Sequence, residues 1–380
     1  MVERVKVVAI PFQTEDPATV VNNVAIAARH ERIDQVWAVG PPGPNTDAVR
    51  EIGSALSAKV LCFPEDRIGT KREGKGDAMN TALLRAATES VERLHFYDAD
   101  ITNFGESWIW GAERAADCGF SVVRHTFARA STDAMITWNI TKPLLAMKYP
   151  GTILPRIGQP LGGEILLSAE AIQALAGEPR VLDRSDWGID TLYTYTAAQR
   201  GFSLFEHHVP DGKRHALYGS LDELKLMVIE CFDAAANLPD GAIPDVNHDR
   251  DPPAPVPEDL QREKAYDVEA STRLLTLPWV GDERATAETL PEHLSGAALE
   301  LTESGDFSFL DEQAWEEFLL HALRGFGLGD PAWESLLFRL WVGRVLNYTT
   351  KHASRGYRHA MSYLEATVAE IERNALHRSG

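Results

Sequence analysis

The stretch Leu94-His95-Phe96-Tyr97-Asp98-Ala99-Asp100 places two carboxylates directly after a short apolar run. We expect Leu94–Tyr97 to form a β-strand. Side chains alternate along a strand, so Asp98 and Asp100, two residues apart, are expected to project to the same side. An isolated Asp-x-Asp is often only a solvated loop, but paired carboxylates at a strand terminus suit Mg²⁺ or Mn²⁺ carrying a diphosphate. The strand context favours the second interpretation.

The chain on either side of this stretch alternates between strand-like runs and helical patterns. Toward the N-terminus, the expected strands are Val5–Ile10, Val36–Gly40 and Lys59–Phe63, and the expected helices are Pro17–Arg32, Ala48–Leu56 and Gly76–Leu94. Toward the C-terminus, the expected strands are Phe120–His125, Ala134–Ile140 and Glu164–Ser168, and the expected helices are Ala169–Leu175 and Asp190–Arg200. This alternation predicts an α/β fold with a Rossmann-like, doubly wound sheet, in which ligands bind beyond the carboxyl ends of the strands.

A change in composition divides the chain near residue 239. Residues 239–257 are rich in Pro and Asp, which is typical of a linker or an exposed connection. Beyond them the chain is strongly helical, and Trp333, Leu337 and Trp341 share one helix face while Leu336 and Leu340 add a second apolar stripe. A helix that is apolar on several sides is buried, either in a helical domain or against another subunit. We therefore expect a catalytic domain over residues 1–238, a linker-like segment over 239–257 and a helical C-terminal domain over 258–380.

The composition excludes some classes of partner. The net charge of −19, from 37 Lys and Arg against 56 Asp and Glu, argues against binding to nucleic acid. No window of eighteen apolar residues is present, and the N-terminus lacks a signal-peptide pattern, so we expect a cytoplasmic protein that does not span a membrane. Cys62, Cys118 and Cys231 lack the spacing of a metal site, which favours reduced structural thiols.

A basic, glycine-containing loop follows the third expected strand. The stretch from Arg67 to Asn80 holds four cations and three glycines and leads into a helix. Glycines allow close backbone approach, and a helix N-terminus attracts anions, so the loop suits a phosphate or a nucleotide sugar. It is not a Walker A loop, because the upstream glycine spacing and the following Ser or Thr are missing. Lys71 and Arg72 are interpreted as solvated, whereas Lys75, between two glycines, is interpreted as functional.

These motifs and others resemble those of the mannosylglycerate synthase family, which are retaining glycosyltransferases of the GT-A fold. The resembling stretches are nearly literal matches spread over most of the chain: Gly74–Leu83, His95–Thr102, Arg129–Trp138, Gln159–Glu164, Arg184–Tyr193 and Arg344–Thr349. The resemblance implies a GT-A nucleotide-sugar domain that transfers α-mannose from GDP-mannose to the 2-hydroxyl of D-glycerate with retention of configuration. The product would be the compatible solute mannosylglycerate, and the protein would be a possible homo-oligomer.

The resemblance also assigns residues to the site. Asp100 and His215 are implied as ligands of a divalent metal, Mn²⁺ or Mg²⁺, and Asp190, Lys75 and Asp100 as catalytic residues. The implied donor site consists of Pro11, Phe12, Gln13, Thr14, Glu15, Val39, Glu65, Lys75, Asp98, Ala99, Leu161, Asp190, Tyr218 and Met227. The implied acceptor site consists of Arg129, Ala134, Met135, Ile136, Thr137 and Trp187. A guanidinium such as that of Arg129 matches the carboxylate of glycerate bidentately.

Several of these residues have a plainer interpretation. Asp190 is also explained as the N-terminal charge of its helix, Trp187 as a core residue and Met227 as packing. Glu65 departs from the family, whose members carry Gln here, and its carboxylate offers acceptors where an amide also offers donors. Two other classes of function remain open: a sugar nucleotidyltransferase that releases pyrophosphate, and a noncatalytic protein that binds sugar nucleotides. A related transferase with another nucleotide donor or small hydroxy acid is a further alternative.

Overall fold

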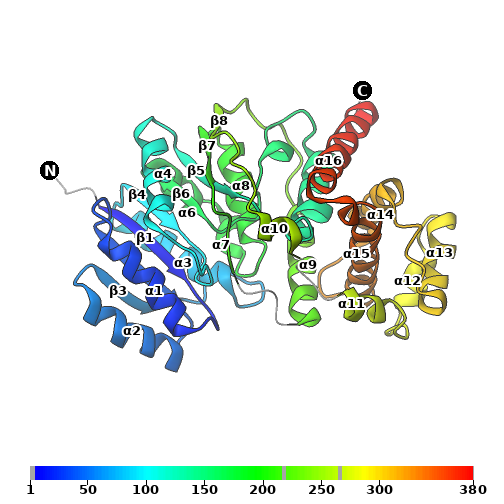
Figure 1. The fold of residues 1–380 in the computed structure, drawn as a ribbon, viewed down its shortest axis with the longest axis horizontal. Helices are drawn as coiled ribbons and strands as arrows, with labels where there is room; N and C mark the ends of the chain where they lie inside the picture. Colours follow the sequence, from blue (N-terminus) through cyan, green and yellow to red (C-terminus); the bar gives the residue numbers. More distant parts are fainter. Residues whose placement is uncertain (1–4, 216–219, 264–267, 380) are drawn as a thin grey trace. The chain divides into compact units, whose positions relative to one another are not determined.

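The structure is a computed structural model that describes residues 5–215, 220–263 and 268–379 (Figure 1). The chain forms two compact units, each built from three separate segments. The first unit consists of Met1–Ala128, Thr152–Ala216 and Gly241–Val256, and the second of Arg129–Gly151, Leu217–Asp240 and Pro257–Gly380. Tyr218, a predicted donor residue, lies outside the described residues.

The first unit contains an eight-stranded mixed sheet with the strand order β3-β2-β1-β4-β6-β5-β7-β8. Its strands are β1 (Lys6–Pro11), β2 (Gln35–Gly40), β3 (Val60–Pro64), β4 (Arg93–Phe96), β5 (Val122–Phe127), β6 (Ile165–Ser168), β7 (Leu204–Val209) and β8 (His248–Arg250). All neighbouring strands pair in parallel except β6, which runs antiparallel to both β4 and β5. The strand expected at the Asp-x-Asp motif is thus confirmed as β4, although it ends at Phe96.

Helices cover both faces of this sheet. They are α1 (Pro17–Arg29), α2 (Pro44–Leu56), α3 (Lys75–Thr88), α4 (Glu106–Asp117), α6 (Ala169–Ala176), α7 (Pro179–Asp183) and α8 (Ile189–Gln199). On one face, Val36 and Ala38 of β2 share a core with residues of α1 and α4. On the other, Arg85 of α3 lies 4.9 Å from the ring centre of Trp37, because side chains alternate along β2. The doubly wound α/β architecture expected from the sequence is confirmed.

The expected elements differ from the observed ones by a few residues at their ends, and two expected segments differ further. The helix expected over Gly76–Leu94 ends at Thr88, because Ser90 adopts a left-handed backbone (φ 57°) before β4 begins. The linker-like segment 239–257 contains an edge strand, β8, which pairs in parallel with β7. There, His248 Nε2 lies 2.8 Å from Glu206 Oε1.

The strand expected over Ala134–Ile140 is wrong. Residues 135 and 136 are helical, Thr137–Thr141 forms a π-helix, and α5 (Lys142–Lys148) continues from it. The β-branched residues suggested a strand, but Ala134 has φ 55° and its N–H bonds Asp133 Oδ1 at 2.6 Å, which turns the chain into a helix. Trp315 Nε1 donates to the carbonyl of Asn139 at 2.6 Å, so tertiary contacts override the local β-propensity.

The second unit is helical. Besides α5 it contains α9 (Leu221–Ala236), α10 (Glu258–Arg262), α11 (Val268–Leu275), α12 (Glu283–Glu288), α13 (Glu292–Ser304), α14 (Glu312–Gly325), α15 (Pro331–Lys351) and α16 (Tyr357–Ser379). The expectation of a helix buried on several sides is confirmed in α15, where Ala332 and every residue from Ser335 to Tyr348 are buried. None of the described helices is both long and apolar enough to cross a membrane.

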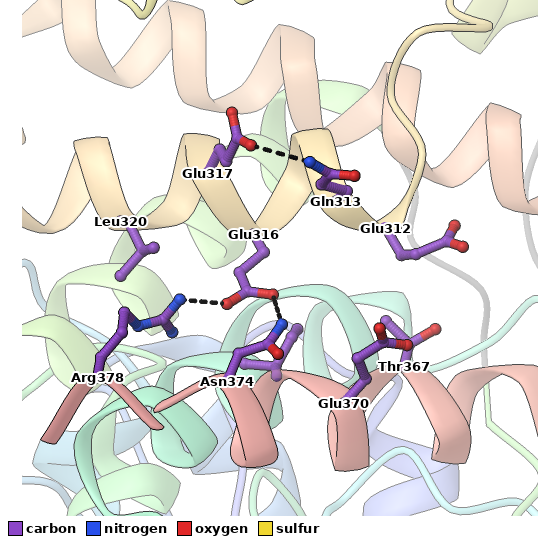
Figure 2. Close-up of a pocket in the computed structure, with 10 residues that line it drawn as sticks. Glu312, Gln313, Glu316, Glu317, Leu320, Thr367, Glu370, Asn374 and Arg378 are labelled. Carbon is purple, nitrogen blue, oxygen red and sulfur yellow. Dashed lines mark hydrogen bonds and ion pairs between the residues drawn. The ribbon is translucent and has the colours of Figure 1, made fainter. Parts of the chain in front are cut away.

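A pocket of about 280 Å³ lies between α14 and α16 of the second unit. Figure 2 shows Glu316 held between Arg378 and Asn374, at 2.8 and 2.9 Å. The ten residues that line the pocket include none of the predicted site residues. The buried carboxylate of this pocket is therefore already paired, and the pocket is separate from the residues that the sequence analysis selected.

Candidate active site

The predicted acidic motif lies in the turn that follows β4. Asn23 of α1 holds this turn, since its Nδ2 donates to the carbonyls of Ala99 at 3.1 Å and Ile101 at 2.9 Å. Asp98 and Asp100 are half-buried, while Ala99 is buried. Because β4 ends before both carboxylates, strand alternation does not govern their directions, and the two side chains have different partners.

Lys75 brings together two of the predicted carboxylates. Its Nζ lies 2.8 Å from Asp98 Oδ1 and 2.9 Å from Asp190 Oδ2, which is in the first turn of α8. The lysine begins α3, and the preceding loop is seated closely on residues 183–185. A Cβ at Gly76 would collide with the carbonyl of Arg184, so this approach requires glycine. The sequence analysis thus selected three residues that meet in one cluster.

Two members of this cluster were missed by the sequence analysis. Lys213 Nζ lies 2.5 Å from Asp98 Oδ2 and 2.6 Å from Glu164 Oε1. Glu164, just before β6, is fully buried, and Lys213 is 6% exposed. A glutamate between Gly163 and an apolar strand is a signal for a buried charge, but the sequence does not show its partner. We call Asp190, Lys75, Asp98, Lys213 and Glu164 the charge chain, because acids and lysines alternate along it.

The charge chain has a surplus of acid, with three carboxylates and two ammonium groups. Burial opposes ionisation of Asp98, but Lys213 and Lys75 outweigh it and hold the pKa of this carboxyl well below its ordinary value. Burial raises the pKa of Asp190, and burial together with the charge of Asp98 raises that of Glu164. Burial would lower the pKa of Lys75, but Asp190 and Asp98 raise it above the ordinary lysine value. Lys75 thus remains charged.

Asp100 and His215 form a second pair beside the charge chain. His215 Nδ1 lies 3.7 Å from Asp100 Oδ2. Asp100 Oδ1 is buried and has no hydrogen-bond partner among the described residues. A carboxylate oxygen and an imidazole are suitable ligands for Mn²⁺ or Mg²⁺, and such ions commonly take further oxygen ligands from phosphate and water. Within the described parts of the chain, no group of three His, Cys, Asp or Glu residues is arranged to hold a metal.

Seven of the predicted donor residues, 11–15, Val39 and Glu65, gather where β1, β2 and β3 end. The backbone N–H of Phe12 donates to the carbonyl of Val39 at 2.9 Å, next to Pro11 at the end of β1. Gln13 Nε2 donates to Glu65 Oε2 at 2.8 Å, and the Gln13 N–H donates to Glu15 Oε2 at 2.5 Å. Burial raises the pKa of Glu65 to about 7 and also raises that of Glu15.

Three other predicted residues also belong to the first unit. Thr14 is exposed and Leu161 is half-buried. Trp187 is also half-buried, and its ring centre lies 5.9 Å from Lys75 Nζ. This places Trp187 beside the charge chain, where a cation over an aromatic ring is weakly stabilising.

The predicted acceptor residues other than Trp187 lie in the second unit, as does Met227. Arg129 Nη1 bonds Asp133 Oδ2 at 2.9 Å. The hydroxyl of Tyr348, in α15, donates to the carbonyl of Ser131 at 2.6 Å and so fastens the same loop. Ala134 is half-buried, whereas four other predicted residues are buried: Met135, Ile136, Thr137 and Met227.

Comparison with known proteins identifies the family. A family model described as "Mannosylglycerate synthase, GT domain" matches residues 6–237, and one described as "Mannosylglycerate synthase C-terminal domain" matches residues 260–368. Mannosylglycerate synthase from Selaginella moellendorffii is 43% identical over 378 residues, covering 96% of this chain and 89% of the relative. Mannosylglycerate synthase from Rhodothermus marinus is 44% identical over 365 residues, covering 94% and 92%.

Solved structures with lower similarity were also found. A glucosyl-3-phosphoglycerate synthase from Mycobacterium tuberculosis, in complex with Mg²⁺ and UDP, is 20% identical with a TM-score of 0.48, covering 63% of this chain and 82% of that one. A mannosyl-3-phosphoglycerate synthase from Rubrobacter xylanophilus is 23% identical with a TM-score of 0.45, covering 61% and 73%. The family matches and the two nearly full-length relatives show that this chain belongs to the mannosylglycerate synthase family of glycosyltransferases.

Proposed function

We propose that this protein transfers α-mannose from GDP-mannose to the 2-hydroxyl of D-glycerate, with retention of configuration. The observation that carries the proposal is the cluster beyond β4, where Lys75 binds Asp98 and Asp190 while His215 lies beside Asp100. Family membership supports the transfer reaction. Lys75 and Lys213 bring two cations into this otherwise acidic cluster.

The donor residues form two groups, which would bind different parts of the nucleotide sugar. Residues 11–15, Val39 and Glu65 would bind the guanosine, which the carboxylates of Glu15 and Glu65 support because guanine presents N–H donors. Lys75, Asp98 and Asp190, with Ala99 and Leu161, would bind the diphosphate and the mannose. Met227 and Tyr218 complete the proposed donor set.

The residues present fit a divalent metal at Asp100 and His215. The fit is supported by the buried, unsatisfied Asp100 Oδ1 and by the imidazole 3.7 Å from the other oxygen. When bound, such an ion neutralises negative charge on the leaving diphosphate. We propose no direct role of Asp98 in metal binding, since Lys75 and Lys213 hold its two oxygens.

The acceptor would bind through Arg129, whose guanidinium matches the glycerate carboxylate. The ion pair with Asp133 and the bond from Tyr348 to Ser131 support this role, because they restrain the loop that carries the arginine. Residues 134–137 and Trp187 would shape the rest of the site. A small anionic hydroxy acid is the acceptor class that this chemistry favours.

We infer that the acceptor hydroxyl attacks from the face that the diphosphate leaves, through an oxocarbenium-like transition state. The departing phosphate oxygen would accept the acceptor's proton, so that no separate protein base is required. Asp190, held by Lys75 at 2.9 Å, would orient the sugar instead of attacking it. A covalent route requires a mannosyl adduct on Asp190. Mass spectrometry of its peptide, after reaction without acceptor, tests for that adduct, and finding it would refute same-face attack.

The decisive experiment is product analysis. Wild-type protein with GDP-mannose, D-glycerate and Mn²⁺ is expected to give α-mannosylglycerate, identified by mass and by anomeric NMR. A sugar nucleotidyltransferase would instead release pyrophosphate from a nucleoside triphosphate and a sugar phosphate. Binding of GDP-mannose without any turnover would contradict the proposed activity.

We also propose residues 1–238 and 258–380 as the catalytic and helical domains, a division supported by family matches over 6–237 and 260–368.

A further inference from the structure

The segment that carries His215 is fastened to the turn beyond β4 by its backbone. The N–H of Thr102 donates to the carbonyl of Arg214 at 2.8 Å, and the N–H of Arg214 donates to Asn103 Oδ1 at 2.9 Å. Asn103 Nδ2 donates to the carbonyl of Gly212 at 3.0 Å. Residues 212–214 are thus held against residues 102–103, which fixes where the side chain of the intervening Lys213 begins.

Lys213 extends from this segment into the charge chain. Its Nζ lies between Asp98 Oδ2 and Glu164 Oε1, at 2.5 and 2.6 Å, and the ring centre of Phe127 is 5.8 Å away. With Lys213 only 6% exposed and Glu164 fully buried, this ammonium group has exchanged water for two carboxylates. Such an exchange is favourable only with well-placed partners.

The two oxygens of Asp98 are held by different lysines, Oδ1 by Lys75 and Oδ2 by Lys213. Space behind the carboxylate is closed, because a Cβ at Gly163 would collide with Asp98 Oδ1 and with Lys75 Nζ. Without Lys213, the buried Glu164 and Asp98 would face each other as like charges. The direction of the Asp98 carboxylate therefore depends on Lys213 as much as on Lys75.

We propose that Lys213 is a positioning residue that fixes the Asp98 carboxylate for the donor sugar. This inference rests on the proposed function, in which Asp98 binds hydroxyls of the transferred mannose. The alternative is that Lys213 only neutralises the buried Glu164 and stabilises the fold. The two possibilities differ in what happens when both of these charges are removed together.

The test compares Lys213→Met, Glu164→Gln and the double variant. Lys213→Met is expected to weaken GDP-mannose binding, measured by calorimetry, by about 10-fold or more, because a charged hydrogen bond contributes roughly 1.5–3 kcal/mol. Binding of GDP, which lacks the sugar, is expected to stay within about twofold of wild type. The double variant is expected to regain stability to urea, since no unpaired charge is left by Glu164, while its turnover stays low.

The control is Lys59→Met. The ammonium group of Lys59 donates to the carbonyl of Ile33 at 2.8 Å, away from the charge chain, so its loss should leave the binding of GDP-mannose unchanged. If the double variant regains both stability and turnover, Lys213 merely balances Glu164 and the inference is overturned. Equal losses of GDP and GDP-mannose binding in a folded double variant would overturn it as well. Should Lys213→Met not fold, the double variant decides alone. The proposed function fails separately, if wild-type protein forms no product from GDP-mannose and glycerate.

Discussion

The two ends of β4 hold buried carboxylates in opposite conditions. At its amino end, Glu113 of α4 is held by two cations, Lys6 and Arg93, which lie 2.6 and 2.8 Å from its Oε2. The imidazole of His95 lies 3.1 Å from its Oε1. At its carboxyl end, three carboxylates share two lysines. Oxygens of Asp100 and Glu164 there are buried without a hydrogen-bond partner among the described residues.

The difference shows in the pKa values. Burial opposes ionisation of Glu113, but hydrogen bonds and charges from His95, Lys6 and Arg93 lower its pKa to about 2. At the other end, burial raises the pKa values of Asp190 and Glu164. A saturated carboxylate contributes to stability and has nothing left to bind, whereas unsatisfied acceptors and shared cations can receive a ligand. This agrees with the rule that ligands bind at the carboxyl ends of strands.

The largest effect on turnover is expected from substitutions at the carboxyl end of β4. Asp100→Ala should lower turnover at least about 100-fold, as loss of groups that stabilise developing charge does. His215→Ala should behave similarly and be partly rescued by high metal concentration. The control is Asp117→Ala at the amino end, a residue paired with Arg32 and Arg93, which should retain full turnover. Undiminished activity after exhaustive chelation would show that the metal assignment is wrong.

Substitution of Glu113 at the amino end of β4 should lower stability and leave catalysis unchanged. Glu113→Gln deprives the half-buried Lys6 and Arg93 of their fully buried carboxylate and should cost roughly 1.5–3 kcal/mol in the free energy of unfolding, measured with urea. The control is Glu89→Gln, which removes an exposed pair with Arg85 and should cost less than about 1 kcal/mol. Because the pKa of Glu113 is lowered to about 2 in the folded state, its contribution is complete above pH 4.5, the ordinary value. It is lost as the pH falls through about 2. Equal stabilities of the two variants would contradict this account.

A smaller and more selective effect is expected at the acceptor loop. Arg129→Ala should raise the KM for glycerate about 10- to 100-fold, because it loses a charged partner worth roughly 1.5–3 kcal/mol. Calorimetry should show nearly unchanged binding of GDP-mannose. Arg324→Ala, on α14 of the same unit, is the matched control. A variant that bound GDP-mannose equally poorly would place Arg129 in the donor site or in the fold.

The smallest expected effect is a pH dependence of the KM for GDP-mannose that is due to Glu65. Its pKa of about 7 means that it gains its charge between roughly pH 6 and 8. An ionised carboxylate accepts more strongly from guanine N–H groups, so the KM for GDP-mannose should fall severalfold as the pH rises through this range. Glu65→Gln should remove the dependence, and the KM for glycerate in wild type serves as the internal reference. Persistence of the dependence in Glu65→Gln would assign it to another group.

The sequence predicted what depends on local pattern. The apolar run before Asp98 located β4, and the glycines around Lys75 located the start of α3. The pairing of Lys213 with Asp98 and Glu164 was not predicted, because these partners lie far away in the sequence. Asp98 is 115 positions from Lys213, and Glu164 is 49 positions from it. The segment 134–140 was misassigned because packing by Trp315 and the left-handed Ala134 decide its conformation. Local propensity carries no information on either contact.

The division of the chain into six alternating segments has a consequence for its synthesis. Residues 129–151 and 217–240 leave the ribosome well before α14 and α15, which supply Trp315 and Tyr348 to contacts with Asn139 and Ser131. The edge strand β8 is made only after the rest of the sheet. Synthesis of the second unit therefore starts before the first unit is complete. A protein cut after residue 257 would keep the apolar segments of the second unit but lack the helices that bury them. Truncation is a poor route to a smaller enzyme here, and such fragments should accumulate as aggregates.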